Sequence, residues 1–335
     1  MEITKIILIL FKLNTILYAQ LNNGLWIENM ENKFAIDISL NNTYETFKIK
    51  TNQTKYLLYP NTEHSLKLKL NYRFISMSIK YAPSFLPING DINKKGKTNN
   101  IEIKSSIITK NWFIESSYSK VTGYYLKNTK DFLPSFGNND PFIKFPKLNY
   151  TSFNITGGYI LNKNFSLKHV FTQTQRQLKS CGSFIPTTEL DYFIINDKSS
   201  NINTQKSNNI EFTLGPGYLY TFVFQESFYL TIGLISSIGY LHTKLTTRFI
   251  NGDNISHQNN YIIKGEGKIG LGYNGKKIYM GIYSNISQKR YKQENTTVIN
   301  TDFKLYYHLF FGIRLNSGEK INNFIDTIIQ KLSTH

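Results

Sequence analysis

The sequence predicts an all-β protein, an antiparallel transmembrane β-barrel of about twelve strands. Apolar and polar residues alternate over many segments, which is the pattern of strands that have one apolar and one polar face. Many of these segments exceed the usual strand length of about five or six residues and reach the roughly 9–11 residues that cross a bilayer. Short turns alternate with long polar loops between them, as in outer-membrane barrels.

The composition agrees with this class and excludes several others. Aromatic residues make up 15% of the 335 residues, with 24 Phe and 23 Tyr, and these side chains favour pleated sheets and membrane–water boundaries. The net charge is +17, but the lysines are scattered and form no basic stripe, so we expect no nucleic-acid partner. The single cysteine, Cys181, excludes an intrachain disulfide and a cysteine-based zinc cluster.

The N-terminus has the layout of a secretory signal. Lys5 precedes a mostly apolar stretch over residues 6–17, and Ala19 stands at the expected cleavage position. Lys12 interrupts the apolar stretch, and an uncleaved membrane anchor is the alternative, although such a span needs about 20 uninterrupted apolar residues. We therefore predict a signal peptide over residues 1–19, export, and a place in the cell outer membrane.

A lead-in segment precedes the predicted barrel. Residues 20–43 have mixed character, with alternation only at Phe34, Ile36 and Ile38, and are predicted as a periplasmic lead-in that holds at most one short strand. The barrel itself is predicted over residues 44–315. Its expected strands are 44–50, 65–72, 75–82, 99–108, 112–126, 148–161, 165–174, 208–224, 228–243, 259–273, 278–290 and 299–315.

Hairpins explain how most of these strands are joined. The apolar phase shifts after Tyr72, and a two-residue loop at Arg73-Phe74 places Tyr72 and Ile75 on the same face. Short turns are also expected at 109–111, 162–164, 225–227 and 274–277. Long polar loops are expected at 51–64, 83–98, 127–147, 241–258 and 291–298.

The short turns belong at the periplasmic end and the long loops at the outer end. With strands at 148–161 and 165–174, this parity places residues 175–207 in one outer loop, where 183–195 is a decoration and not a crossing. If 183–195 and 33–39 both cross, the barrel has about fourteen strands instead. A soluble β-sandwich or internal-cavity barrel is the rival architecture, since its strands also alternate.

The C-terminal segment, residues 316–335, changes character. After Gly318 the apolar residues fall at helical spacing: Ile321, Phe324, Ile325, Ile328, Ile329 and Leu332. We expect a short amphipathic helix at the periplasmic mouth of the barrel. A helix that binds a partner protein is the alternative.

The inward face of the predicted barrel is polar and rich in lysine. It contains Lys67, Lys69, Lys80, Glu102, Lys104, Lys168, Glu211, Lys264, Glu266, Lys268, Lys304 and Arg314. A lumen with a mild preference for anions is therefore a hypothesis. His308 also points inward, either as a plain lumen residue or as a catalytic base.

A dense polar cluster follows the expected strand 165–174. It comprises Gln173, Gln175, Arg176, Gln177, Lys179 and Ser180, at the outer rim by the parity above. One interpretation is an ordinary solvated loop. The other is a constriction or plug inside the lumen, where these donors would pair with inward carboxylates such as Glu102 and Glu211.

The sequence offers little catalytic chemistry. Residues 91–98 resemble a phosphate-binding loop, but the glycine spacing is wrong and a strand follows where a helix is required. The glycines of 265–272 lie within a strand and predict room for crowded inward neighbours. The six histidines show no metal-ligand spacing, so we expect no metal, no cofactor and no enzymatic activity.

Three functions remain open from the sequence. The first is a pore or transport-type barrel for small solutes. The second is a barrel whose outer loops bind a partner in adhesion or assembly, and the third is a barrel-embedded hydrolase. The partners expected in every case are outer-membrane lipid and the machinery that inserts barrels.

Several short segments resemble an uncharacterised Bacteroidetes family catalogued as domain of unknown function 4421. They are WFIESSYSKVTGYYL at 112–126, preceded by KGKT at 95–98, and FTQTQRQLKSCGSF at 171–184, with GPGY at 215–218 and GYN at 272–274. Cys181 stands where a small residue is usual, and the tail past Leu315 is longer than expected. The resemblance implies an outer-membrane-type β-barrel and supplies no activity.

Overall fold

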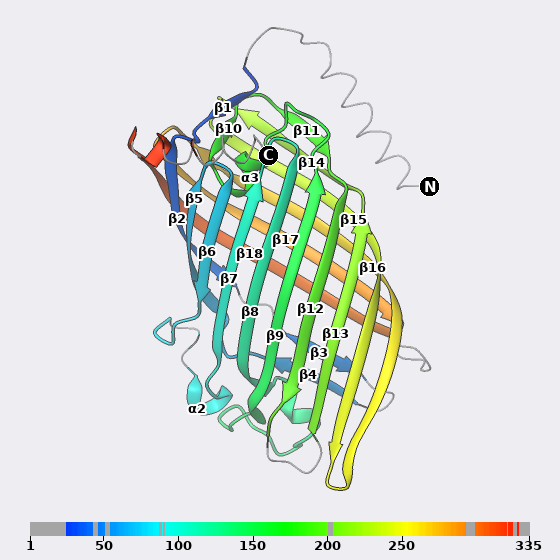
Figure 1. Ribbon diagram of the computed structural model, residues 1–335. Helices are drawn as coiled ribbons and strands as arrows, with labels where there is room; N and C mark the ends of the chain where they lie inside the picture. Colours follow the sequence, from blue (N-terminus) through cyan, green and yellow to red (C-terminus); the bar gives the residue numbers. More distant parts are fainter. Residues whose placement is uncertain are drawn as a thin grey trace, which may run out of the picture.

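The computed structural model describes residues 25–42, 46–50, 54–86, 89, 91–199, 204–292, 299–319, 321–323 and 327 (Figure 1). The predicted signal peptide lies outside these residues, as do five of the apolar residues of the expected C-terminal helix. Residues 319, 321–323 and 327 are helical. Among the described residues, no helix has the length and apolar character needed to cross a membrane.

Twelve antiparallel strands form a closed ring, because the last strand pairs with the first. In ring order they are β2 (Lys33–Asn42), β5 (His64–Tyr72), β6 (Ile75–Tyr81), β7 (Asn99–Ile108), β8 (Trp112–Leu126), β9 (Lys144–Tyr159), β12 (Thr187–Asp197), β13 (Thr204–Gly215), β15 (Phe228–Phe249), β16 (Gly252–Asn274), β17 (Ile278–Lys292) and β18 (Ile299–Asn316).

Two of these wall strands are extended by a second strand on the other side of a proline. β11 (Cys181–Phe184) precedes β12, and β14 (Gly217–Phe224) follows β13. The interruptions lie at Pro186 and Pro216, where the missing N–H removes one ladder hydrogen bond. Both extensions stay in the sheet, because β11 pairs with β14 and β14 pairs with β15.

Side chains that face outward are apolar and exposed, as a lipid-facing wall requires. Ile263 is 67% exposed, Leu309 58% and Leu68 54%, and all three lie in the middle of long strands. A soluble protein buries such a band in a core, so this face excludes the soluble rival architecture. The antiparallel transmembrane barrel predicted from the alternation is confirmed.

The strand count of twelve is confirmed, but two of the predicted members are wrong. Residues 33–42 form β2, within the predicted lead-in, and residues 181–197 cross the wall as β11 and β12. Residues 44–50 instead contribute β3 (Phe47–Lys50), which forms a small hairpin with β4 (Lys55–Tyr59). Residues 165–174 contain the helix α3 (Leu167–Phe171). Two segments that were not predicted as wall strands belong to the wall, and two predicted strands do not. The total therefore stays at twelve, and the fourteen-strand alternative is also wrong.

The connections divide between two ends of the barrel. One end, the short-turn end, holds the turns after β5, β7, β14 and β16 and also residues 160–180, since Tyr159 at the end of β9 pairs with Trp112 at the start of β8. The other end, the long-loop end, holds α2 (Ile92–Lys95) and the 3₁₀ turn η2 (Thr129–Asp131). The expected loop 241–258 is instead a continuation of β15 and β16, whose hairpin projects beyond the rest of the wall (Figure 1).

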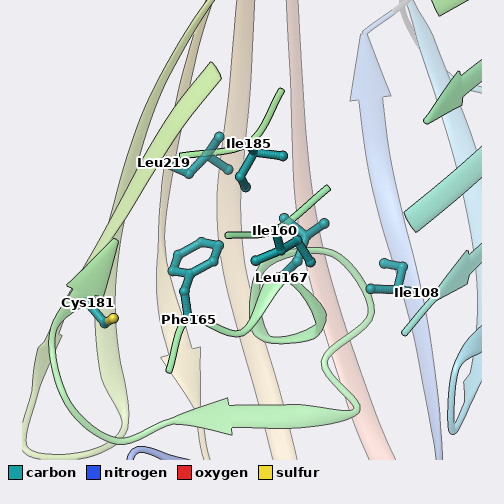
Figure 2. Packing of buried hydrophobic residues seen from close by; sticks show 7 residues of the cluster. All are labelled: Ile108, Ile160, Phe165, Leu167, Cys181, Ile185 and Leu219. Carbon is teal, nitrogen blue, oxygen red and sulfur yellow. The ribbon is translucent and has the colours of Figure 1, made fainter. Parts of the chain in front are cut away.

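Apolar clusters pack inside the barrel near both ends. At the short-turn end Ile108, Ile160, Phe165, Leu167, Cys181, Ile185 and Leu219 form one cluster (Figure 2). At the long-loop end Phe47 and Tyr56 of the β3–β4 hairpin pack against Val121, Tyr124 and Leu148. Between these clusters the interior is polar, and this part of the lumen forms the candidate site.

Candidate functional site

Residues 161–180 and the strand β1 (Ile27–Asn29) lie together at the short-turn end of the barrel, and we call them the plug (Figure 1). β1 pairs with β10 (Gln175–Gln177) in antiparallel register, with Ile27 opposite Gln177 and Asn29 opposite Gln175. The two segments are far apart in sequence but form one small sheet. The plug therefore contains both the start of the described chain and the connection between β9 and β11.

Local signals fold the inserted connection. Ser166 caps α3, since its hydroxyl accepts a hydrogen bond of 3.0 Å from the backbone N–H of His169. The helix stops where Gln173 adopts a left-handed conformation, with φ of 56°, and its N–H donates to the carbonyl of Lys168 at 2.7 Å. This reversal directs the chain into β10.

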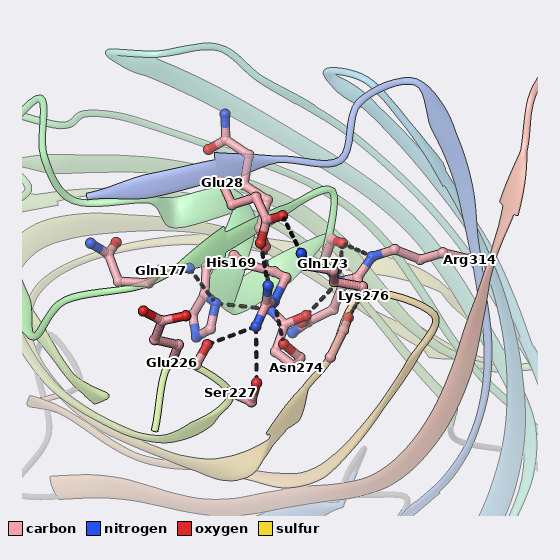
Figure 3. Close-up of polar contacts among 12 residues, drawn as sticks. Glu28, His169, Gln173, Gln177, Glu226, Ser227, Asn274, Lys276 and Arg314 are labelled. Atoms are coloured by element: carbon pink, nitrogen blue, oxygen red, sulfur yellow. Dashed lines mark hydrogen bonds and ion pairs between the residues drawn. The ribbon is translucent and has the colours of Figure 1, made fainter. Parts of the chain in front are cut away.

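Arg176 is the main anchor of the plug, and only 4% of its surface is exposed. Figure 3 shows its partners Glu28, Ser227 and Asn274 close together. Its Nε donates to the carbonyl of Asn274 at 2.7 Å, and its Nη2 donates to the Glu226 carbonyl and the Ser227 hydroxyl, each at 2.9 Å. Its Nη1 forms an ion pair with the carboxylate of Glu28 in β1. One guanidinium thus joins both parts of the plug to two turns of the wall.

Arg314 on β18 holds the plug from the opposite side. Its Nε and Nη2 donate to the carbonyl of Gln173 at 3.0 and 2.6 Å, and Nη2 also donates to Asn274 Oδ1 at 2.5 Å. The guanidinium lies 4.8 Å from the centre of the Tyr279 ring, within cation–π range. The predicted inward residue Arg314 therefore binds the plug and not the open lumen.

His169 lies between the two arginines and is neutral. Its Nδ1 accepts hydrogen bonds from the N–H of Gln177 at 3.0 Å and from Asn274 Nδ2 at 2.8 Å. Burial, together with the charges of Arg314 and Arg176, lowers the pKa of His169 to about 3. A proton on Nδ1 would break both hydrogen bonds, so the plug fits the neutral ring alone.

Further contacts complete the plug. Lys168 forms an ion pair with Glu31, and Lys69 of the wall donates to the carbonyl of Phe171. The hydroxyl of Thr174 donates to the carbonyl of Arg73 in the β5–β6 turn at 3.0 Å. Leu167 and Phe165 enter the apolar cluster of Figure 2. Polar and apolar contacts therefore both fix the plug to the wall.

A polar cavity of about 410 Å³ lies next to the plug, and Leu167, Val170, Phe171 and Gln173 form part of its lining. The sequence had predicted a lining dominated by lysine, and this is wrong. The lining holds seven lysines and seven carboxylates. The lysines are Lys67, Lys69, Lys104, Lys264, Lys268, Lys289 and Lys304, and the carboxylates are Asp37, Glu102, Glu115, Glu189, Asp191, Glu211 and Glu266.

Ion pairs join many of these groups across the interior. Lys289 of β17 reaches Glu211 of β13 at 2.8 Å, although two strands separate them in the ring. Lys264 of β16 likewise reaches Glu189 of β12 at 2.5 Å. The intervening strand β15 has the small residues Ser237 and Gly239 on its inward face, and Ser237 is directly opposite Lys264 in register.

The structure corrects the predicted position and partners of the polar cluster. Gln173, Gln175, Arg176 and Gln177 lie in the plug at the short-turn end, not at the outer rim, and the buried Arg176 excludes a solvated loop. Their carboxylate partners are Glu28 and Glu31. Glu102 and Glu211 bind Lys80 and Lys289 instead.

The remaining predicted residues are dispersed. Lys179 lies over the Trp26 ring at 5.6 Å, while Lys304 and His308 line the cavity. The ring of His308 packs near Tyr283 and Tyr306, with ring centres 5.4 and 5.5 Å away. Within the described part of the chain, no group of three or more His, Cys, Asp or Glu side chains is placed to hold a metal ion.

The sequence did not identify four residues in or next to the plug: Glu28, Glu31, His169 and Asn274. Glu28 and Glu31 lie in the predicted lead-in, where no periodic pattern marks them. His169 and Asn274 were assigned to a strand and to a turn, so their convergence depends on the position of the plug. The acidic pair directly before β2 was the available signal, since a buried arginine requires a carboxylate.

Comparison with solved structures finds outer-membrane proteins at low similarity. The ferric citrate transporter FecA has a TM-score of 0.31 and 8% identity, and the match covers 83% of this chain and 41% of FecA, about two fifths of its length. The β domain of the Bordetella autotransporter BrkA gives 0.35 and 9%, covering 84% and 98%. OmpT, an outer-membrane protein of Vibrio cholerae, gives 0.30 and 8%, covering 86% and 99%.

Sequence comparison is more specific. No curated protein matches the chain. The profile of the family described as "Domain of unknown function (DUF4421)" matches residues 23–314, which span the plug and all but the end of the barrel wall. The chain therefore belongs to this family.

Proposed function

We propose that this protein is a gated transport-type barrel of the outer membrane. A small polar solute enters the cavity from the long-loop end and passes the short-turn end only when the plug moves. The observation that supports this proposal is the plug itself, which lies across the lumen directly beside a charged cavity of about 410 Å³. Outer-membrane barrels place their short turns in the periplasm, so the gate would face that compartment.

A gate explains the plug better than an open pore does. The plug buries Arg176 to 4% exposure and His169 to 1%. Arg176 makes three hydrogen bonds to the wall, and His169 accepts one from Asn274. Loss of such contacts costs free energy, so the closed state dominates unless a ligand or partner offsets it. The wall does not depend on the plug, because β9 and β12 pair directly from Gly158 to Leu148.

The remaining partners follow from the exposed apolar wall. We expect contact with outer-membrane lipid, and insertion by the cellular machinery that assembles barrels. The proposal assigns no catalytic step to the chain and no cofactor or metal to the lumen.

Conductance of single molecules in a planar lipid bilayer tests the gate. In the test variant, residues 163–180 are replaced by a three-residue turn, which is feasible because the Leu161 N–H donates to the Phe184 carbonyl at 3.2 Å. We expect the current through the native protein to stay near the baseline. The current through the variant should rise in steady steps as single molecules insert. A matched control replaces residues 134–139 at the long-loop end by the same turn and should behave as the native protein does.

Two outcomes contradict the proposal. Native protein that conducts as well as the variant is an open pore, and a folded variant without conductance has no path through its lumen. Swelling of liposomes in sugars of graded size then measures the width of the path in the variant.

A further inference from the structure

Two histidines lie together on the outward face of the β15–β16 hairpin, away from the lumen. His242 of β15 is opposite Asn259 of β16, and His257 lies two residues before Asn259, toward the tip of the hairpin. β16 pairs with β17 only from Ile262 onward, so at His257 it has no described partner strand on that side, and the outward residues Lys244, His257 and Asn259 are exposed. The aromatic pair Tyr240 and Tyr261, with ring centres 6.1 Å apart, precedes the histidines on the barrel side. Water therefore has access to both imidazoles.

The distance between their nitrogens fits a shared metal ion. His242 Nε2 and His257 Nδ1 are 3.4 Å apart. Two nitrogens that bind one tetrahedral ion at roughly 2.0–2.1 Å lie about 3.3–3.4 Å from each other. At 3.4 Å the contact is longer than the usual range of about 2.7–3.2 Å for an N–H···O hydrogen bond.

The tautomer of His242 is also set for metal binding. Its Nδ1 lies 2.8 Å from Asn259 Oδ1, and an amide oxygen can only accept, so Nδ1 carries the proton. The lone pair of Nε2 is then directed toward His257. Metal-binding histidines commonly donate their second N–H to an oxygen in this manner.

We propose that His242 and His257 bind one divalent transition-metal ion, with Asn259 orienting His242. Imidazole nitrogens suit Cu²⁺, Zn²⁺ and Ni²⁺, and the general order of affinities favours Cu²⁺. Water fills the other coordination positions, so the ion exchanges readily. Bound metal joins β15 to β16 on the outer face of the barrel and independently of the plug.

Lys244 is the one cation directly opposite His257 in the register of the described hairpin, and it is exposed. Its charge opposes a bound dication and limits the affinity. Replacement of Lys244 by glutamine removes this repulsion without touching a ligand, so it provides a variant that should bind more tightly.

Calorimetric titration of the full chain in detergent with Cu²⁺, and then with Zn²⁺, tests the site. We expect one ion that is absent from the H242A/H257A double variant. Each single variant should lose most of this binding, because chelation needs both rings. N259A should weaken the affinity about tenfold or more, as second-layer partners usually do, and K244Q should strengthen it.

His64→Ala serves as the matched control, since this histidine lies on β5 and should leave the titration unchanged. Heat-modifiable electrophoretic mobility shows that each variant is folded. Single variants that keep half of the bound metal would show two independent histidines and overturn the proposal. A double variant that titrates like the native protein would overturn it as well.

Discussion

At the scale of single residues, the plug depends on side chains that bind backbone carbonyls. Arg176 and Arg314 donate to the carbonyls of Asn274, Glu226 and Gln173, so they fix the path of the chain and not only its charge. Asn274 has a comparable role, because its side chain donates to His169 and accepts from Arg314. Arginine is suited to this task, since its fork of donors has a fixed geometry.

The closed plug should weaken in acid because of His169. Its pKa is about 3 in the closed state, against an ordinary value of 6.5 when the plug is released. Above pH 6.5 the ring is neutral in both states and closure is fully stable. As the pH falls from 6.5 toward 3, only the released state binds the proton, so closure at pH 5 loses about 2 kcal/mol.

Hydrogen exchange of the backbone amides in the plug at pH 7.5 and pH 5, corrected for intrinsic rates, measures this loss. His169→Asn keeps an acceptor near the position of Nδ1 and removes the titration. The difference between the two pH values should therefore shrink in this variant. An equal loss of protection in the variant and the native protein would show that another group is responsible.

At the scale of elements, the alternation of apolar and polar residues identified most wall strands. The local pattern could not decide for every segment whether it belongs to the wall. Residues 165–174 alternate at Phe165 and Leu167, yet Leu167 and Phe171 also have the spacing of a helical turn, and Ser166 supplies its cap. Once a strand was assigned there, the parity of the connections placed the polar cluster at the wrong end. The position of the plug was not accessible from the sequence, because Arg176 meets Glu28 across 148 residues.

Residues 183–195 were predicted as part of an outer loop, whereas the structure places them in the wall. Deletion of β12 tests which of the two is right. Residues 187–197 pair with β9 on one side and, up to Asn196, with β13 on the other, so their loss opens the ring. We expect a chain without residues 187–197 to lose heat-modifiable mobility. A chain with residues 163–180 replaced by a short turn should keep it. If the chain that lacks β12 still migrates as a folded barrel, residues 183–195 are part of a loop and do not cross the wall.

At the scale of the whole molecule, the barrel separates an apolar exterior from an interior in which charges balance. The sequence predicted the polarity of the interior correctly, and it identified Glu102, Glu211 and Lys304 as lumen residues. It missed Asp37, Glu115, Glu189 and Asp191, which offset the lysines. Asp37, Glu189 and Asp191 lie in segments that were not predicted to cross, and Glu115 was not counted among the inward residues. The predicted lumen therefore had an apparent excess of positive charge.

The balance predicts weak charge selectivity in a barrel that lacks the plug. The reversal potential of the 163–180 replacement variant across a salt gradient should lie near zero. Adding Lys264→Gln and Lys289→Gln leaves Glu189 and Glu211 without their ion-pair partners, and the potential should shift toward cation preference. A marked anion preference before these substitutions would instead support the lysine-rich lumen inferred from sequence.

The pairing of β1 with β10 also imposes an order on biogenesis. The ring has its seam between β2 and β18, the first and last strands of the wall, and β1 directly precedes β2. β1 must therefore wait at the seam until β10 is in place, and the final strand then encloses both. Synthesis from the N-terminus leaves Glu28 and Glu31 without their partners during this interval. Arg314 of β18 also holds the plug, so we expect the plug to be completed only when the last strand closes the ring.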